Sequence, residues 1–138
     1  MDLQDVEIGA ELPGKVVHVD RRRLVDYAAA SGDGNPIHQD EELARSVGLP
    51  DVIAHGMWTM GAAIEVVTQW VGDPARVRSY TTRFTKPVVV PADGGADLEV
   101  TGVVKSVNPQ ERTATVTLTV TCDGVSVLGR ATAVVDLG

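Results

Sequence analysis

The sequence predicts an α+β protein in which a curved antiparallel sheet encloses one long helix. The first observation is a segment over residues 57–71 that is apolar nearly all round, as in a helix that other parts of the chain wrap. The second is the change after Arg76 to alternating, β-branched segments with short turns, which favours antiparallel strands. At 138 residues, with 43% hydrophobic and 22% charged residues, the chain is expected to form one globular domain over residues 1–138.

The N-terminal part of the chain predicts a strand followed by a helix. Residues 14–19 alternate as in a short strand, and Asp20 is a suitable N-cap for a helix over residues 21–30. Leu24 and its apolar neighbours give this helix an apolar stripe, so we expect one of its faces to pack on the core.

Residues 33–47 predict a loop and a second helix. We expect the loop not to be helical, because Pro36 restricts the residue before it and Gly34 allows a sharp bend. A short helix is expected over residues 40–47, with Gly48 at its end.

The long helix and the strands occupy the rest of the chain. Gly72 is the expected breaker after the helix over residues 57–71, and Pro74 prevents its continuation. The strands are expected to form an antiparallel meander, because the turns between them are short. We expect strands near residues 77–90, 97–107, 112–122 and 125–136, with turns at residues 91–95, 108–109 and 123–124.

Composition and charge argue against several classes of protein. The formal net charge of -7 argues against general nucleic-acid binding, which needs a cationic surface. No apolar run approaches the ~20 residues that span a bilayer, and the acidic N-terminus, residues 1–5, lacks a signal-peptide pattern. We therefore expect a cytoplasmic protein that binds neither nucleic acid nor membrane. The single Cys122 cannot form an internal disulfide and is interpreted as a small buried hydrophobe.

The most informative stretch sets a carboxylate and an imidazole five residues apart, in Asp33-Gly34-Asn35-Pro36-Ile37-His38-Gln39-Asp40. A carboxylate and a histidine held at one point can move a proton from one atom to another. The alternative is a turn aspartate and a surface histidine, both of which are common in loops. The stiff Asn35-Pro36 connection favours the catalytic interpretation, because loops on a rigid scaffold commonly carry catalytic groups.

His55-Gly56 immediately precedes the long helix and forms a second candidate. Helix N-termini expose unpaired N–H groups and a partial positive charge, and Gly56 lets a ligand approach the backbone closely. This combination can stabilise an oxyanion. The alternative is that Gly56 only lets the chain enter the core and that His55 packs there as a hydrogen-bonded core histidine.

Two further patterns have less specific interpretations. A metal site is not expected, because His38, Asp40 and His55 are ligand types without a recognised paired spacing. Arg22 is expected to pair with Asp26 at i+4. The run Arg21-Arg22-Arg23 is interpreted either as a solvated face or as a basic patch that receives a phosphate-bearing or acidic partner, joined by Arg76, Arg78, Arg83 or Lys86.

These residues resemble a known family. Asp33-x-Asn35-Pro36-x-His38-x-Asp40 resembles the signature of the MaoC-like dehydratases and (R)-specific enoyl thioester hydratases, which have the hot-dog fold. The resemblance continues in order through Ala44-x-x-x-Gly48-Leu49, Ile53-Ala54-His55-Gly56-Met57, Arg83-Phe84-x-x-Pro87-Val88 and Gly129-Arg130-Ala131. Within the family, the B subunits of the mycobacterial (3R)-hydroxyacyl carrier-protein dehydratases are similar also at Ser31-Gly32-Asp33, Trp70 to Pro74 and Val104 to Val107.

The resemblance implies a fold and an activity. The fold is a single hot-dog domain, a curved antiparallel sheet wrapped around one long central helix, and two such units pair edge to edge with active sites at their interface. The activity is reversible syn elimination of water from a 3-hydroxyacyl thioester of acyl carrier protein or coenzyme A, in fatty acid or related acyl-chain metabolism. The resemblance implies Asp33 and His38 as the catalytic pair and the Gly56 N–H as the group that faces the thioester oxygen. No metal, flavin or nicotinamide cofactor is implied.

Supporting residues and partners follow from the same resemblance. Asn35 and Pro36 are expected to shape the loop, and Asn35 either hydrogen-bonds Asp33 or the substrate or has only a turn role. Some family hydratases carry a supporting serine about a turn and a half into the central helix, where this chain has Thr59 and Ala62. The expected assembly is a homodimer, or a heterodimer with a second hot-dog subunit of the A or C type.

Two alternative functions stay open. A hot-dog acyl thioesterase would act on similar substrates, but that family lacks the Asp-x-Asn-Pro-x-His loop. A non-catalytic partner subunit of a heterodimeric dehydratase is the second alternative, and the intact Asp33 and His38 argue against it.

Overall fold

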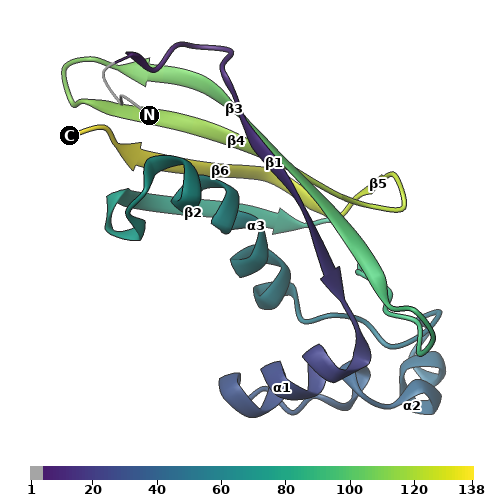
Figure 1. Ribbon diagram of the computed structural model, residues 1–138. Coiled ribbons are helices and arrows are strands. Elements are labelled where there is room, and N and C mark those ends of the chain that lie inside the picture. Colours follow the sequence, from purple (N-terminus) through teal and green to yellow (C-terminus); the bar gives the residue numbers. More distant parts are fainter. Residues whose placement is uncertain (1–4) are drawn as a thin grey trace.

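The structure, a computed structural model, describes residues 5–138 and places an open, curved antiparallel sheet over one long helix (Figure 1). Residues 1–4, part of the N-terminus interpreted above, lie outside the described residues. The elements in chain order are β1 (Glu11–Val19), α1 (Arg21–Ser31), the 3₁₀ turn η2 (Pro36–His38), α2 (Glu41–Ser46), α3 (Gly56–Val71), the 3₁₀ turn η3 (Pro74–Arg76), β2 (Val77–Phe84), β3 (Ala96–Asn108), β4 (Thr113–Cys122), β5 (Val125–Ser126) and β6 (Leu128–Asp136).

The two short helices form where the sequence predicts them. Asp20 caps α1 by accepting a hydrogen bond from the Arg23 N–H at 2.9 Å, and Gly32 ends the helix with a φ of 79°. Asp40 caps α2 through the Leu43 N–H at 3.1 Å. Both helices lie together at one end of the molecule, below the end of α3 (Figure 1).

The long helix α3 buries one face under the sheet and leaves the other face partly open. The sequence predicted a helix that is enclosed on all sides. In this chain the open sheet covers only one face of α3, so the prediction is confirmed for that face alone. Met57, on the uncovered side, is 61% exposed. The buried residues of α3 are Thr59, Ala63, Val66, Val67 and Val71.

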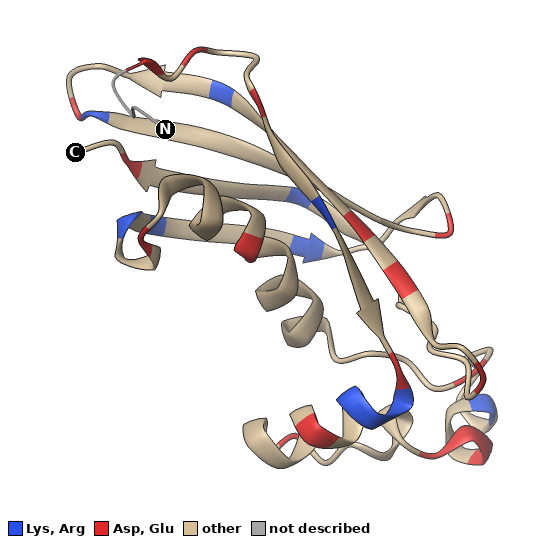
Figure 2. Cartoon of the chain, in the orientation of Figure 1, with Lys and Arg blue, Asp and Glu red and all other residues tan. Residues whose placement is uncertain are grey.

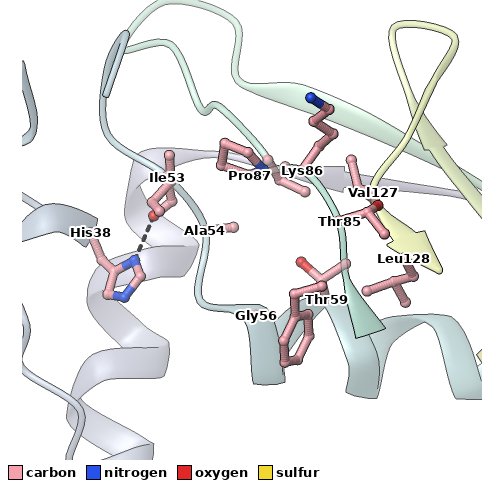
Figure 3. Close-up of a pocket in the computed structure, with 12 residues that line it drawn as sticks. His38, Ile53, Ala54, Gly56, Thr59, Thr85, Lys86, Pro87, Val127 and Leu128 are labelled. Carbon is pink, nitrogen blue, oxygen red and sulfur yellow. Dashed lines mark hydrogen bonds between the residues drawn. The ribbon is translucent and has the colours of Figure 1, made fainter. Parts of the chain in front are cut away.

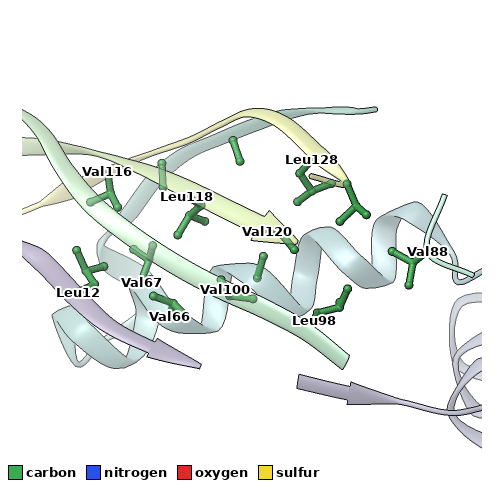
Figure 4. Packing of buried hydrophobic residues seen from close by; sticks show 14 of the residues in the cluster. Leu12, Val66, Val67, Val88, Leu98, Val100, Val116, Leu118, Val120 and Leu128 are labelled. Atoms are coloured by element: carbon green, nitrogen blue, oxygen red, sulfur yellow. The ribbon is translucent and has the colours of Figure 1, made fainter. Parts of the chain in front are cut away.

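The core lies between α3 and the strands that cross it (Figure 4). Every second residue of the central strands points into it, as the alternating sequence predicts. Fully burying a valine or leucine side chain stabilises the fold by about 1.5–3 kcal/mol relative to leaving it exposed. The central strands contribute Leu98, Val100 and Val104 from β3 and Val116, Leu118 and Val120 from β4.

The sheet has the order β1-β3-β4-β6-β2, with β5 pairing β4. The predicted meander is confirmed for β3, β4 and β6, but it is wrong for β2, which pairs with β6 at the opposite edge from β1. The reason is the path of the chain after Phe84, which leaves the sheet and runs beside the segment before α3, where the Val90 N–H donates to the Val52 carbonyl at 2.9 Å. The predicted strand over residues 77–90 therefore ends at Phe84.

Two other strand bounds also differ from the prediction. β1 begins at Glu11 rather than at residue 14, and it carries a bulge between Leu12 and Lys15. The predicted strand over residues 125–136 divides into β5 and β6. Among the described residues, no helix is both long enough and apolar enough to cross a membrane.

Arg21 serves the fold rather than a basic patch. Its guanidinium contacts Asp51 at 2.9 Å and Glu41 at 3.1 Å. Its Nε donates to the Val90 carbonyl at 2.6 Å. Because two carboxylates neutralise it, Arg21 ties α1 to α2 and to the segment that follows β2.

The other arginines named with it are spread over the molecule (Figure 2). Arg22 pairs with Asp26 at 3.6 Å on the exposed surface, as the i+4 spacing predicts. Arg76 and Arg78 both bond Asp136, at the end of the sheet far from α1. Arg76 and Arg78 therefore do not join the arginines at the start of α1, and that part of the basic-patch interpretation is wrong.

Candidate active site

The segment between α1 and α2 folds around its own polar side chains. Asp33 Oδ1 accepts a hydrogen bond from the Asn35 N–H at 3.1 Å, and Asn35 Oδ1 accepts one from the Ile37 N–H at 3.2 Å. Pro36 then opens the 3₁₀ turn η2, because its fixed φ suits the first position of a helical turn. The expectation of a wholly non-helical loop is wrong for this turn. The turn buries His38, while Asp33 stays exposed.

His38 is held in one tautomer by the main chain. The residue is only 6% exposed, so the alternative of a surface histidine is wrong. Its Nδ1 lies 2.7 Å from the Ile53 carbonyl (Figure 3). A carbonyl oxygen can only accept, so Nδ1 carries the proton and Nε2 of the neutral ring keeps a free lone pair. Such a nitrogen can take a proton from a substrate.

Burial lowers the pKa of His38 below its ordinary value of 6.5, because desolvation penalises the charged ring. The neighbouring His55 also lowers this pKa. The hydrogen bond to the Ile53 carbonyl and the charge of Asp33 act in the opposite direction and offset the effect only in part. His38 is therefore neutral near pH 7, which is the state that a general base requires.

His55 packs directly against His38. The two rings stack with their centroids 3.7 Å apart and their planes inclined by 22°, and the Tyr27 ring meets His55 edge-on at 4.7 Å. His55 is 2% exposed, and its Nε2–H donates to the Asp33 carbonyl at 3.1 Å. His55 is thus a hydrogen-bonded core histidine, as the second interpretation expected, and it also contacts the candidate catalytic loop. The oxyanion interpretation of His55-Gly56 stays a prediction.

The side chains of Asp33, His38 and His55 are of the types that bind metals, and one ligand atom from each lies within 4.8 Å of the others. The donor set fits a divalent metal, but the ring geometry does not. The lone pair of an imidazole nitrogen lies in the plane of its ring. Two stacked rings inclined by 22° therefore direct their lone pairs side by side and not toward one ion. A metal-free site stays our prediction.

Gly56 begins α3 and offers a main-chain donor. Within the described chain no side chain caps this end, and the first hydrogen bond of the helix runs from the Thr59 N–H to the His55 carbonyl at 3.1 Å. The Gly56 N–H thus lacks an intrahelical partner, and the helix dipole adds a partial positive charge. A Cβ at position 56 would lie 3.0 Å from the Phe84 ring, so any larger residue there would press on that ring and displace it or the helix end.

His38 and Gly56 line one cavity of ≈ 330 Å³ (Figure 3). Its walls are mostly apolar, with polar groups from His38, Thr59, Thr85 and Lys86, which is the usual character of a site for a small organic ligand. The exposed Asp33 is not among the described residues that line it, but a side-chain oxygen of Asp33 lies within 4.8 Å of a ring nitrogen of each buried histidine. The apolar walls include Phe84, Pro87, Val88, Val127 and Leu128.

Thr59 also lines this cavity and is 2% exposed. Its hydroxyl donates to the His55 carbonyl at 3.4 Å, one turn earlier in α3. A hydroxyl contact from Thr59 to Asp33 therefore stays a prediction.

The profile of the MaoC like domain matches residues 5–123. The chain belongs to the MaoC-like family. This match confirms the resemblance drawn from the motifs, and it covers Asp33, His38, His55, Gly56 and Thr59. The sheet and helix described here are accordingly those of a MaoC-like hot-dog fold, with an open sheet.

The MaoC-like chain is similar to several known proteins. It is 37% identical over 102 residues to 3-hydroxyacyl-thioester dehydratase X of Mycobacterium tuberculosis, covering 67% of this chain and 35% of that protein. A solved MaoC-like dehydratase is 45% identical with a TM-score of 0.96, over 99% of this chain and 42% of that one. The chain thus spans less than half the length of both proteins.

Two other solved structures are closer in length to this MaoC-like chain. R-Hydratase PhaJ1 from Pseudomonas aeruginosa is 28% identical with a TM-score of 0.79, over 98% of this chain and 84% of that one. The ChsH1-ChsH2 complex from Mycobacterium tuberculosis contains a chain that is 25% identical with a TM-score of 0.77, over 94% of each chain.

Two contributions to the MaoC-like site could not be predicted from side chains. The Ile53 carbonyl, which fixes the tautomer of His38, is a main-chain atom and leaves no mark on the sequence pattern. Phe84 belongs to a motif that carried the family resemblance, but its position over Gly56 depends on where β2 ends.

Proposed function

We propose that this chain is a (3R)-hydroxyacyl thioester dehydratase, which in the reverse direction acts as an (R)-specific enoyl thioester hydratase. The observation that carries the proposal is the pairing of two groups on one apolar cavity. His38, a neutral ring with a free Nε2, and Gly56, whose N–H lacks an intrahelical partner, both line it. The dehydratase and hydratase names of the relatives support the same reaction class.

The proposed dehydration needs one base, one route for the proton and one oxyanion donor. His38 Nε2 takes the proton from the carbon beside the thioester carbonyl, and the carbon–oxygen bond to the 3-hydroxyl breaks as the double bond forms. Asp33 helps to deliver a proton to the departing hydroxyl, so that the products are an enoyl thioester and water. Positioned acid and base groups of this kind typically accelerate reactions ~100–10,000-fold.

The Gly56 N–H supplies the oxyanion donor. Removal of the proton builds negative charge on the thioester oxygen, and the N–H and the dipole of α3 are placed to receive it. One such donor is typically worth ~100–1,000-fold in rate. The acyl group would lie along the apolar walls beside Phe84 and Leu128.

We propose that the carrier of the acyl group is coenzyme A or acyl carrier protein and that a second hot-dog subunit completes the site. Three features support a partner at this side of the molecule. β2 is an edge strand, Phe84 at its end is 54% exposed although it lines the cavity, and one face of α3 is only partly covered. The ChsH1-ChsH2 structure shows a similar chain in a complex.

The reaction is tested by incubating the protein with crotonyl-CoA and following two signals, the loss of enone absorbance and the release of free thiol. Because a partner subunit is proposed, the assay is run on the protein alone and with candidate second subunits. The proposal predicts loss of the enone without thiol release and formation of (R)-3-hydroxybutyryl-CoA. Thiol release at the rate of enone loss would show a thioesterase instead, and the (S) product would refute the stereochemistry.

A further inference from the structure

We infer that His55 is a positioning residue, which fixes the Asp33 loop relative to the His38 ring. It does so as a neutral imidazole with its proton on Nε2. This inference rests on the proposed function, in which His38 is the base. It assigns His55 no contact with substrate.

The His55 ring makes two contacts, one with the Asp33 main chain and one with the His38 ring. The His55 Nε2–H reaches the Asp33 carbonyl at 3.1 Å, and a carbonyl can only accept, so the proton is on Nε2. One face of the same ring stacks on His38 with centroids 3.7 Å apart. Asp33 and its neighbours are otherwise exposed, so His55 ties an exposed loop to a buried base.

The other nitrogen of His55, Nδ1, is buried and is left by this arrangement without a hydrogen bond to any described residue. An unsatisfied buried polar atom needs an explanation, because an apolar ring would fill the same space without it. The need for an Nε2–H donor at Asp33 supplies that explanation.

No described group around His55 offers Nδ1 a hydrogen-bond acceptor. The titratable groups that face His55 are Tyr27 from α1, His38 from η2 and Asp33 from the loop. A proton on Nδ1 would bury an N–H without an acceptor and place a cation on the face of His38.

The test uses two substitutions at position 55 and a matched control. His55→Phe keeps a ring for stacking and removes the donor, whereas His55→Gln keeps an N–H where Nε2 lies. His18→Phe makes the same change at an exposed histidine of β1. We expect His55→Phe to lower kcat for crotonyl-CoA hydration ~10–100-fold with little change in KM, as misplaced catalytic groups do. We expect His55→Gln to recover most of the rate and His18→Phe to leave it unchanged.

A measurement on the unmodified protein keeps the inference testable where His55→Phe does not fold. Long-range ¹⁵N–¹H spectra of the imidazole rings should show His55 as the Nε2–H tautomer and His38 as the Nδ1–H tautomer. An Nδ1–H tautomer at His55 would overturn the inference, and so would a folded His55→Phe protein with an unchanged kcat. Failure of the proposed function would give a different result from failure of this inference. In that case the unmodified protein would not hydrate crotonyl-CoA with any partner, whichever tautomers the histidines adopt.

Discussion

The chain holds its three histidines in two different ways. On the sheet, His18 of β1 lies 2.7 Å from the Asp97 carboxylate of β3, and both side chains are more than half exposed. At the start of α3, His38 and His55 are buried, stack on each other and direct their protons to main-chain carbonyls. The first histidine contacts a carboxylate at the exposed surface, whereas the other two are buried and contact main-chain oxygens.

The difference shows what turns a histidine into a base. A carbonyl partner fixes which nitrogen carries the proton, and burial keeps the ring neutral, so the second nitrogen stays free. In the buried region, His38 and Gly56 line one cavity at the N-terminus of α3. The predictions below separate the two regions by making matched changes in each.

The largest effect is expected from His38→Ala. Loss of the base should lower kcat for hydration ~100–10,000-fold. The matched substitution His18→Ala should leave kcat unchanged. Both rates are measured with crotonyl-CoA at equal concentrations of folded protein, as judged by circular dichroism. Equal losses in the two variants would remove the distinction between the regions.

A smaller loss is expected from Gly56→Ala. The added Cβ would lie 3.0 Å from the Phe84 ring and force the ring or the helix end to move. Such a displacement at a catalytic donor should lower kcat/KM by up to ~100-fold. Gly61→Ala is the control on the same helix, because a Cβ there meets nothing within 4 Å.

Gly61→Ala should keep the full rate and raise the free energy of unfolding by about 0.5–1 kcal/mol, the usual gain for Gly to Ala inside a helix. Denaturant unfolding measures this gain. An equal loss of rate in both glycine variants would show that position 56 has no special role.

The pH dependence of kcat/KM should follow the lowered pKa of His38. The base works only when neutral, so activity falls as pH drops through its pKa. Because burial lowers that pKa, the acid midpoint should lie below the ordinary value of 6.5. A midpoint above 6.5 would mean that His38 is not the titrating base or is not buried in the free enzyme.

The smallest effect is expected at the exposed pair. Asp97→Asn removes the carboxylate beside His18, and exposed ion pairs of this kind contribute only ~0–1 kcal/mol to stability. The melting temperature should therefore change by a few degrees at most, and the hydration rate should not change. A large loss of activity would place the second region in the site.

Local signals in the sequence predicted the helices well. Asp20 and Asp40 cap α1 and α2, and Gly72 ends α3 with a φ of 82°, all as their positions predict. These outcomes depend on a few neighbouring residues, so they are readable without the fold. The motif residues Asp33, His38 and Gly56 were likewise identified from short segments, and the family match was confirmed.

Long-range packing could not be predicted in the same way. β2 pairs with β6 because the chain after Phe84 runs beside the segment that precedes α3, and no turn signal encodes that route. The burial of His38 and its stacking on His55 depend on residues far apart in sequence. Arg21 appeared to belong to a basic run, but Glu41 and Asp51, which neutralise it, are distant along the chain.

The central claim is that the loop carrying Asp33 and the buried His38 adds and removes one water. The most direct test compares the hydration of crotonyl-CoA by the unmodified protein with that by folded Asp33→Asn and His38→Ala proteins, with the partner subunit present where the unmodified protein requires one. The account predicts (R)-3-hydroxybutyryl-CoA from the unmodified protein and a loss of ~100-fold or more in both variants. Hydration by both variants at the unmodified rate would contradict it.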